Sequence, residues 1–225
     1  MFHWLLRPTI YDKLYLGLLV VVSVVLISRY RNITYTIKPL LWLCLLHLGV
    51  ELVADYLHFG FTPPIDNVFL YHLQTPLDYT FLAMFFYRTF ADSRLKRLVY
   101  WSVPIFYGIA LLLTLTYEPL DQVNGVAMLT ESLLITFWCF QFFRSLLALS
   151  SEYYPERDPT FWIVVAVLFY FVGTFFTFGS LNYFLINDLE VGRKVYFASY
   201  VFYYLLYGTI GVTCLLNFPV RTHEH

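Results

Sequence analysis

The chain is dominated by long apolar runs, each about as long as a helix that crosses a lipid bilayer. A hydrocarbon core about 30 Å thick requires ~20 apolar residues in helical conformation. We predict spans at residues 14–28, 39–59, 67–90, 98–117, 123–149, 161–185 and 195–218. Only helices or closed barrels satisfy every backbone polar group in lipid, and the alternating pattern of barrel strands is absent. The sequence therefore predicts an all-α, polytopic membrane protein, a single seven-transmembrane-helix bundle over residues 1–225.

The composition supports this class. Of the 225 residues, 60% are hydrophobic and only 13% are charged, whereas a soluble domain has about 25% charged residues. The net charge of −1 offers no basic surface, so nucleic acid is excluded as a partner. Cys44, Cys139 and Cys214 fall in three different apolar runs, which argues against a disulfide framework or a thiolate metal site.

The basic residues predict the orientation in the membrane, because Lys and Arg are enriched in cytoplasmic loops. With the N-terminus outside, ten of the fourteen basic residues fall on the inner side: Arg29, Arg31, Lys38, Arg88, Arg94, Lys96, Arg97, Arg144, Arg157 and Arg221. Arg7, Lys13, Arg193 and Lys194 then lie outside. The odd number of spans places the C-terminus in the cytoplasm, and we expect the plasma membrane or an inner membrane.

Ionisable residues inside the predicted spans are the main candidates for function, since they are costly in lipid and usually face a bundle interior or a cavity. The second span carries His47, Glu51, Asp55 and His58, which share a helix face within an arc of roughly 80°. The third span carries His72, Gln74 and Asp78, and the fifth carries Glu131.

The seventh span presents a row of tyrosines, Tyr196, Tyr200, Tyr203 and Tyr207. Its spacing matches that of the polar face of the second span, so we expect the two rows to face each other across the bundle. Buried hydroxyls need hydrogen-bond partners in any bundle, so interhelical packing is the alternative interpretation of these tyrosines. His58 and His72 lie near the predicted outer boundary, where they would also suit a wetted interface.

Three functions fit these residues. The first is a sensor-like bundle in which a cavity open to the outer side binds a small molecule or lipid, and a membrane signalling partner passes the signal on, because the short loops hold no output domain. The predicted ligand-binding residues are His47, Glu51, Asp55, Asp78, Glu131, Tyr200, Tyr203 and Tyr207. The second is a proton-coupled transporter that uses the buried carboxyl groups as a relay.

The third function is a metal-dependent intramembrane hydrolase, the form that an enzyme would take here, although we expect a binding protein rather than an enzyme. Its predicted zinc ligands are His58, His72 and Asp55, with Glu131 as a further candidate, and Glu51 or Asp78 is the candidate general base. No lysine lies near the middle of a span, so no retinal is expected. The histidines within the spans, His47, His58 and His72, are too few for two haem ligand pairs, so no haem is expected.

Overall fold

A computed structural model describes residues 10–62, 65–148 and 154–216. These residues form seven α-helices, namely α1 (Ile10–Ser28), α2 (Lys38–Phe59), α3 (Phe69–Thr89), α4 (Ser93–Thr116), α5 (Gly125–Leu147), α6 (Pro159–Asn187) and α7 (Leu189–Leu215), and a short 3-10 helix, η1 (Pro155–Arg157). No strand occurs among the described residues. The prediction of an all-α bundle of seven helices is confirmed.

Six of the helices, all except α3, are long and apolar enough to cross a membrane. α3 has 21 residues, but His72, Gln74, Asp78 and Arg88 make it more polar than the others. It packs against α2, α4 and α5. These neighbours cover much of α3 and so keep its polar side chains from lipid, where they would be costly. The chain is therefore a multi-pass integral membrane protein in which the most polar helix is packed among apolar ones.

Several helices are longer than the apolar runs that predicted them. α1, α4 and α7 begin four, five and six residues before their predicted starts. Their first turns hold charged residues, among them Asp12, Arg94 and Glu190, which an apolar run excludes but a helix end can expose. The predicted ends at residues 149 and 218 lie outside the described residues, as do Arg7 and Arg221, which contributed to the predicted orientation.

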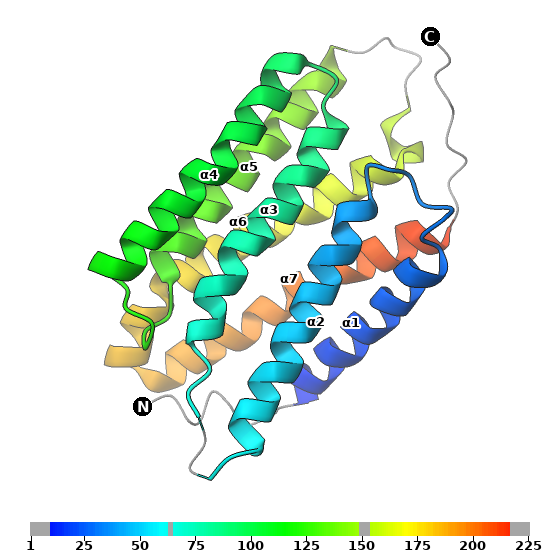
Figure 1. Cartoon of the computed structure of the whole chain (residues 1–225). Coiled ribbons are helices and arrows are strands. Elements are labelled where there is room, and N and C mark those ends of the chain that lie inside the picture. Colours follow the sequence, from blue (N-terminus) through cyan, green and yellow to red (C-terminus); the bar gives the residue numbers. More distant parts are fainter. Residues whose placement is uncertain (1–9, 63–64, 149–153, 217–225) are drawn as a thin grey trace.

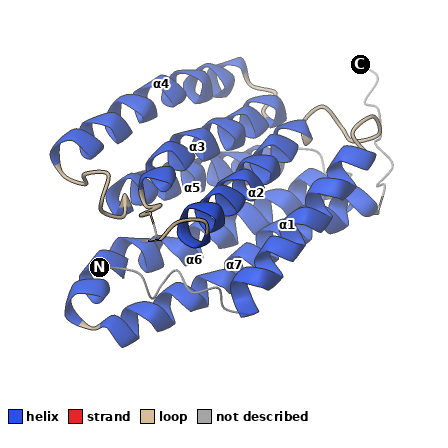
Figure 2. Ribbon diagram, turned by 60° about the horizontal axis from the view of Figure 1, so that its bottom comes forward, coloured by secondary structure: helices blue, strands red, loops and turns tan. Residues whose placement is uncertain are grey.

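Six helices form a closed ring in the order α1, α2, α3, α5, α6 and α7, and α7 returns to α1. α4 packs outside this ring, against α3 and α5, and lies at the outer edge of the bundle (Figures 1 and 2). A ring of this size encloses central space that side chains or a ligand must fill. The position of each polar side chain relative to that space decides what the bundle can bind.

Proline and acidic residues fix where two of these helices begin. Pro159 is the first residue of α6, where its missing N–H removes no helical hydrogen bond. Asp158 precedes it, and its carboxylate accepts a hydrogen bond from the Thr160 N–H at 2.7 Å, as an N-cap does. At the start of α5, the buried Glu118 carboxylate accepts the Val126 N–H at 2.9 Å.

Apolar side chains fill one half of the bundle, the half in which α1 ends and α2 begins. Leu26, Leu40, Phe86, Trp138 and Ile210 are buried there together. α6 and α7 approach each other closely at Gly173, where an added Cβ would fall 2.2 Å from the Phe202 ring. The absence of a side chain at Gly173 therefore lets these two helices pack directly against each other.

Candidate functional site

A cavity of about 130 Å³ lies inside the ring of six helices, and we call it the main cavity. One water molecule needs roughly 10–15 Å³ on this measure, so the main cavity holds several waters or a small organic molecule. Its walls come from α1, α2, α3, α5, α6, α7 and the residues just before α3 and α5, and α4 contributes none of the described lining. The lining residues of these helices lie in the half of the bundle that the apolar core does not fill.

The lining combines acidic, aromatic and apolar side chains. Polar groups come from His47, Glu51, Asn67, Gln74, Thr75, Asp78, Glu131, Ser132 and Thr174, and rings come from Tyr15, Tyr71, Tyr170, Phe171, Phe178, Tyr196, Tyr200 and Tyr203. Among the described residues that line it, none is Lys or Arg. The main cavity therefore brings together six of the predicted ligand-binding residues, namely His47, Glu51, Asp78, Glu131, Tyr200 and Tyr203.

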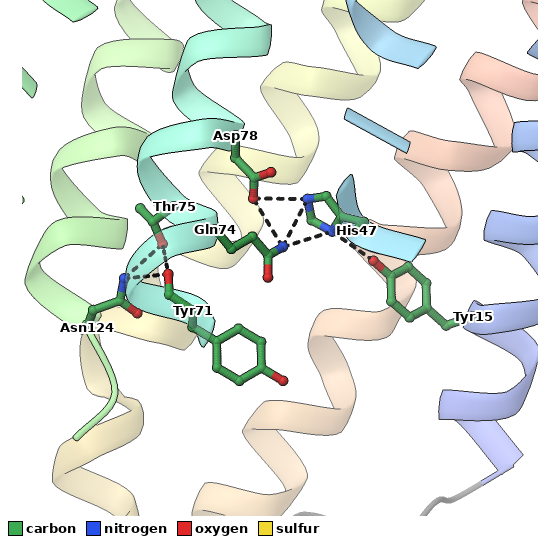
Figure 3. A network of polar contacts seen from close by, with 7 residues as sticks. All are labelled: Tyr15, His47, Tyr71, Gln74, Thr75, Asp78 and Asn124. Atoms are coloured by element: carbon green, nitrogen blue, oxygen red, sulfur yellow. Dashed lines mark hydrogen bonds and ion pairs between the residues drawn. The ribbon is translucent and has the colours of Figure 1, made fainter. Parts of the chain in front are cut away.

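A chain of hydrogen bonds crosses from α1 to α3 through His47 on α2 (Figure 3). Oδ2 of Asp78 lies 2.9 Å from His47 Nε2, and a carboxylate acceptor at this position places a ring proton on Nε2. The other ring nitrogen, Nδ1, then accepts the hydroxyl proton of Tyr15, whose oxygen lies 3.0 Å away. His47 is only 6% exposed, so this pairing satisfies an imidazole that water does not reach freely.

Gln74 joins the same cluster from α3. Its amide nitrogen lies 3.1 Å from His47 Nδ1 and donates a hydrogen bond to Asp78 Oδ2 at 3.2 Å. At the next residue of α3, Asn124 donates a hydrogen bond to the Thr75 hydroxyl at 2.8 Å (Figure 3). Asn124 precedes α5, so this bond fixes the first half of α3 against α5 and thereby positions Gln74 and Asp78.

Four acceptor oxygens on the main cavity lack a protein partner. They are Asn67 Oδ1, Gln74 Oε1, Asp78 Oδ1 and Glu131 Oε1, which are buried and have no hydrogen-bond partner among the described residues. The side chains that carry them all line the main cavity. An unsatisfied buried polar group is destabilising by about 1–3 kcal/mol, so water or another molecule in the cavity would stabilise these four atoms.

A second, smaller pocket of about 70 Å³ adjoins the main cavity, and we call it the side pocket. The two share Glu51, Asn67, Tyr71 and Tyr196 in their linings. The rest of the side pocket is lined by Asp12, Lys13, Leu16, Ala54, Asp55 and His58. Lys13 and Asp55 are exposed, so the side pocket lies at the surface of the bundle, next to the main cavity.

The polar face of α2 is thus divided between the two spaces. His47 lines the main cavity, Asp55 and His58 line the side pocket, and Glu51 lines both. We predicted Asp55 as a ligand-binding residue beside His47, but the structure places it in the side pocket instead. Its position two turns further along α2, near the helix end, brings it to the surface.

The tyrosines of α7 lie across from that face of α2, as predicted. Tyr200 and Tyr203 line the main cavity with His47 and Glu51. Tyr207 is buried one turn further along α7, and its ring centroid lies 5.5 Å from that of His47. On one side of the ring, α1 lies between α2 and α7, because it packs against both of them.

The predicted zinc ligands are not brought together. Asp55 and His58 share the side pocket, but His72 lies elsewhere: its Nδ1 contacts Thr114 Oγ1 at 3.0 Å, and its Nε2 contacts the Gln122 carbonyl oxygen at 2.8 Å. His72 therefore faces α4 and the loop after it. Within the described ranges, no group of three or more His, Cys, Asp or Glu side chains is arranged to hold a metal ion. The structure therefore does not group the predicted set His58, His72 and Asp55 into one metal site.

Two residues that contact predicted ones were not predicted from the sequence. Tyr15 is the partner of His47, and the Asp12 carboxylate accepts a hydrogen bond from the Tyr200 hydroxyl. Asp12 was outside the predicted span, which began at residue 14. Both lie on one face of α1, three residues apart, and that spacing is the signal from which they could have been found.

Comparison with protein-family models, with curated proteins and with solved structures finds no match to this chain.

Proposed function

We propose that this membrane protein binds a small molecule in the main cavity, between the helices of the ring. The observation that carries this proposal is the set of four unpartnered acceptor oxygens, on Asn67, Gln74, Asp78 and Glu131, around one cavity. A bundle that existed only for its own packing would place apolar side chains at these positions, since buried polar groups without partners lower stability. We further propose the predicted sensor role, in which a membrane signalling partner passes the signal on after the ligand has bound.

Further support comes from the arrangement around the oxygens. His47 and the Gln74 amide nitrogen are held by Tyr15 and Asp78, so the polar end of the site is organised before a ligand arrives. Such preorganisation reduces the entropy lost on binding. Apolar side chains such as Phe171 and Leu181 complete the walls, as in most small-molecule sites.

Native mass spectrometry tests the proposal. The full-length protein in lipid nanodiscs is equilibrated with a small-molecule extract of its own cells, and retained masses are recorded. Ser132 lines the main cavity and is buried, so Ser132→Phe fills the space. Its neighbour Leu133 is 60% exposed, which makes Leu133→Phe the matched control.

We expect a non-covalent small mass on the wild-type protein and on Leu133→Phe, and its loss from Ser132→Phe. Among the described residues, the Ser132 hydroxyl bonds only the backbone oxygen of Met128 on its own helix, so its removal breaks no hydrogen bond between the described helices. Equal retention by both variants, or no retained mass on the wild-type protein, would overturn the proposal.

Proton-coupled transport is the second candidate, because the chain Asp78, His47 and Tyr15 links three helices through groups that exchange protons. Proteoliposomes with an internal pH-sensitive dye test it with the same extract. Transport predicts a proton flux on addition of the extract that His47→Leu abolishes. Binding without any flux would reject transport and leave the binding proposal in place.

A further inference from the structure

We propose that the ligand of the main cavity is a small organic cation, a protonated amine that carries a short apolar body. This inference rests on the proposed function and names the chemical class of the ligand. Its basis is the acidic lining of the site, the hydrogen-bonding character of its free atoms and the aromatic rings around them.

The unpartnered atoms are all acceptors. Gln74 Oε1, Asp78 Oδ1 and Glu131 Oε1 each require a donor, and an alkylammonium group offers up to three N–H donors, as the lysine head group does. Gln74 and Glu131 are only 8% and 6% exposed, so what occupies the main cavity decides whether their free oxygens gain a donor.

Most ionisable groups of the two adjoining spaces are acidic. Five carboxyl side chains line them, Asp12, Glu51, Asp55, Asp78 and Glu131. Lys13 is the single Lys or Arg among the described lining residues, and it lies at the exposed side of the side pocket. Buried carboxylates without a counter-charge are costly, and a predominantly acidic lining attracts cations.

The acidic groups of the main cavity come from different helices. No three His, Cys, Asp or Glu side chains in the described residues are grouped to hold a metal ion. Asp78 on α3 and Glu131 on α5 line the same cavity, so an organic cation bound there has acidic groups from two helices around it. The surrounding tyrosine rings, among them Tyr170 and Tyr203, suit a cation because an aromatic face attracts positive charge.

Isothermal titration calorimetry on the full-length protein in phosphatidylcholine nanodiscs tests the inference with three probes. 2-Phenylethylamine is protonated at about pH 7, since alkyl amines titrate near 10. 2-Phenylethanol has the same carbon skeleton without the charge, and the trimethylated phenylethylammonium ion has the charge without N–H donors. We expect the amine to bind at least about tenfold more tightly than the alcohol, a difference of about 1.4 kcal/mol, and more tightly than the trimethylated ion.

Variants of matched size separate charge from packing. Glu131→Gln removes the charge and keeps the volume, and we expect at least about tenfold weaker binding of the amine with unchanged binding of the alcohol. Glu190→Gln is the control, because Glu190 is exposed on the first turn of α7 and pairs with Lys194. The comparison of probes on the wild-type protein remains decisive even if Glu131→Gln does not fold.

The outcomes distinguish this inference from the proposed function. Equal affinity for amine and alcohol, with loss of both in Ser132→Phe, would reject the cationic ligand and support small-molecule binding. Amine binding that is unchanged in Glu131→Gln would also reject the inference. If no probe binds the wild-type protein, the amine class is rejected, and the mass-spectrometry experiment then decides whether the proposed function fails with it.

Discussion

Replacing Tyr15 with phenylalanine removes a single hydroxyl group from the centre of the bundle. The phenyl ring keeps its packing, because the centroids of Tyr203 and Tyr207 lie 4.9 and 5.9 Å from that of Tyr15. The lost hydroxyl is the partner of His47 Nδ1 at 3.0 Å. Since Tyr15 and His47 are 3% and 6% exposed, bulk water does not readily replace it.

The loss of unfolding free energy depends on whether Gln74 replaces the missing hydroxyl. A buried group left without its partner is destabilising by about 1–3 kcal/mol, whereas side-chain hydrogen bonds between membrane helices average about 0.6 kcal/mol. The Gln74 amide nitrogen lies 3.1 Å from the same Nδ1, so it satisfies the imidazole once the hydroxyl is gone. We expect Tyr15→Phe to lower the unfolding free energy by about 0.5 kcal/mol alone, and by about 1.5 kcal/mol in a Gln74→Met background.

Equilibrium unfolding of the full chain in mixed detergent and dodecyl sulfate micelles, followed by circular dichroism, measures these differences. Tyr56→Phe is the control, because Tyr56 is 65% exposed and should be neutral. The two substitutions are in one network, so we expect the double variant to lose more than the sum of the single variants. Tyr15→Phe without effect in either background would refute the hydrogen-bonded chain through His47.

Three further predictions concern the fold and its orientation. Glu118→Ala removes the acceptor of the Val126 N–H and should lower the unfolding free energy by about 0.5–2 kcal/mol, seen as a lower melting temperature; an unchanged value would contradict this capping role. Gly173→Ala should also lower the melting temperature, because its Cβ would fall 2.2 Å from a ring of α7, while Gly208→Ala, with no atom within 4 Å, should be neutral. The predicted orientation places residue 121 outside, so Asp121→Cys should react with an impermeant maleimide on intact cells. The native cysteines are buried and should give little background, and reaction only after permeabilisation would reverse the predicted orientation.

The helix pattern was predictable because the energetic cost of polar groups in lipid is strong and local. Residue 159, a proline preceded by the capping Asp158, lies within two residues of the predicted start of the sixth span. The starts of α1 and α7 were missed by four and six residues, because charged first turns extend beyond the apolar run. Hydropathy detects the part of a helix that lipid covers, and helix caps and charged first turns lie outside that part.

The candidate site was predictable only in part. His47 and Glu51 line the cavity, as the helical spacing of α2 indicated. His72 faces α4 instead, and residues two apart such as His72 and Gln74 point in directions roughly 200° apart on a helix, so α3 could not direct both toward α2. Which helix lies beside which is decided by packing over the whole ring, and Tyr15 on α1 became the partner of His47 through that packing.

An experimental density map of the full-length protein, prepared with 2-phenylethylamine in nanodiscs, tests the central claim most directly. We predict continuous density in the main cavity, with the amine nitrogen within hydrogen-bond distance of unpartnered oxygens on Gln74, Asp78 or Glu131. Ser132→Phe should remove that density. A cavity that holds only ordered water bridging the three oxygens, under saturating amine, would contradict the account.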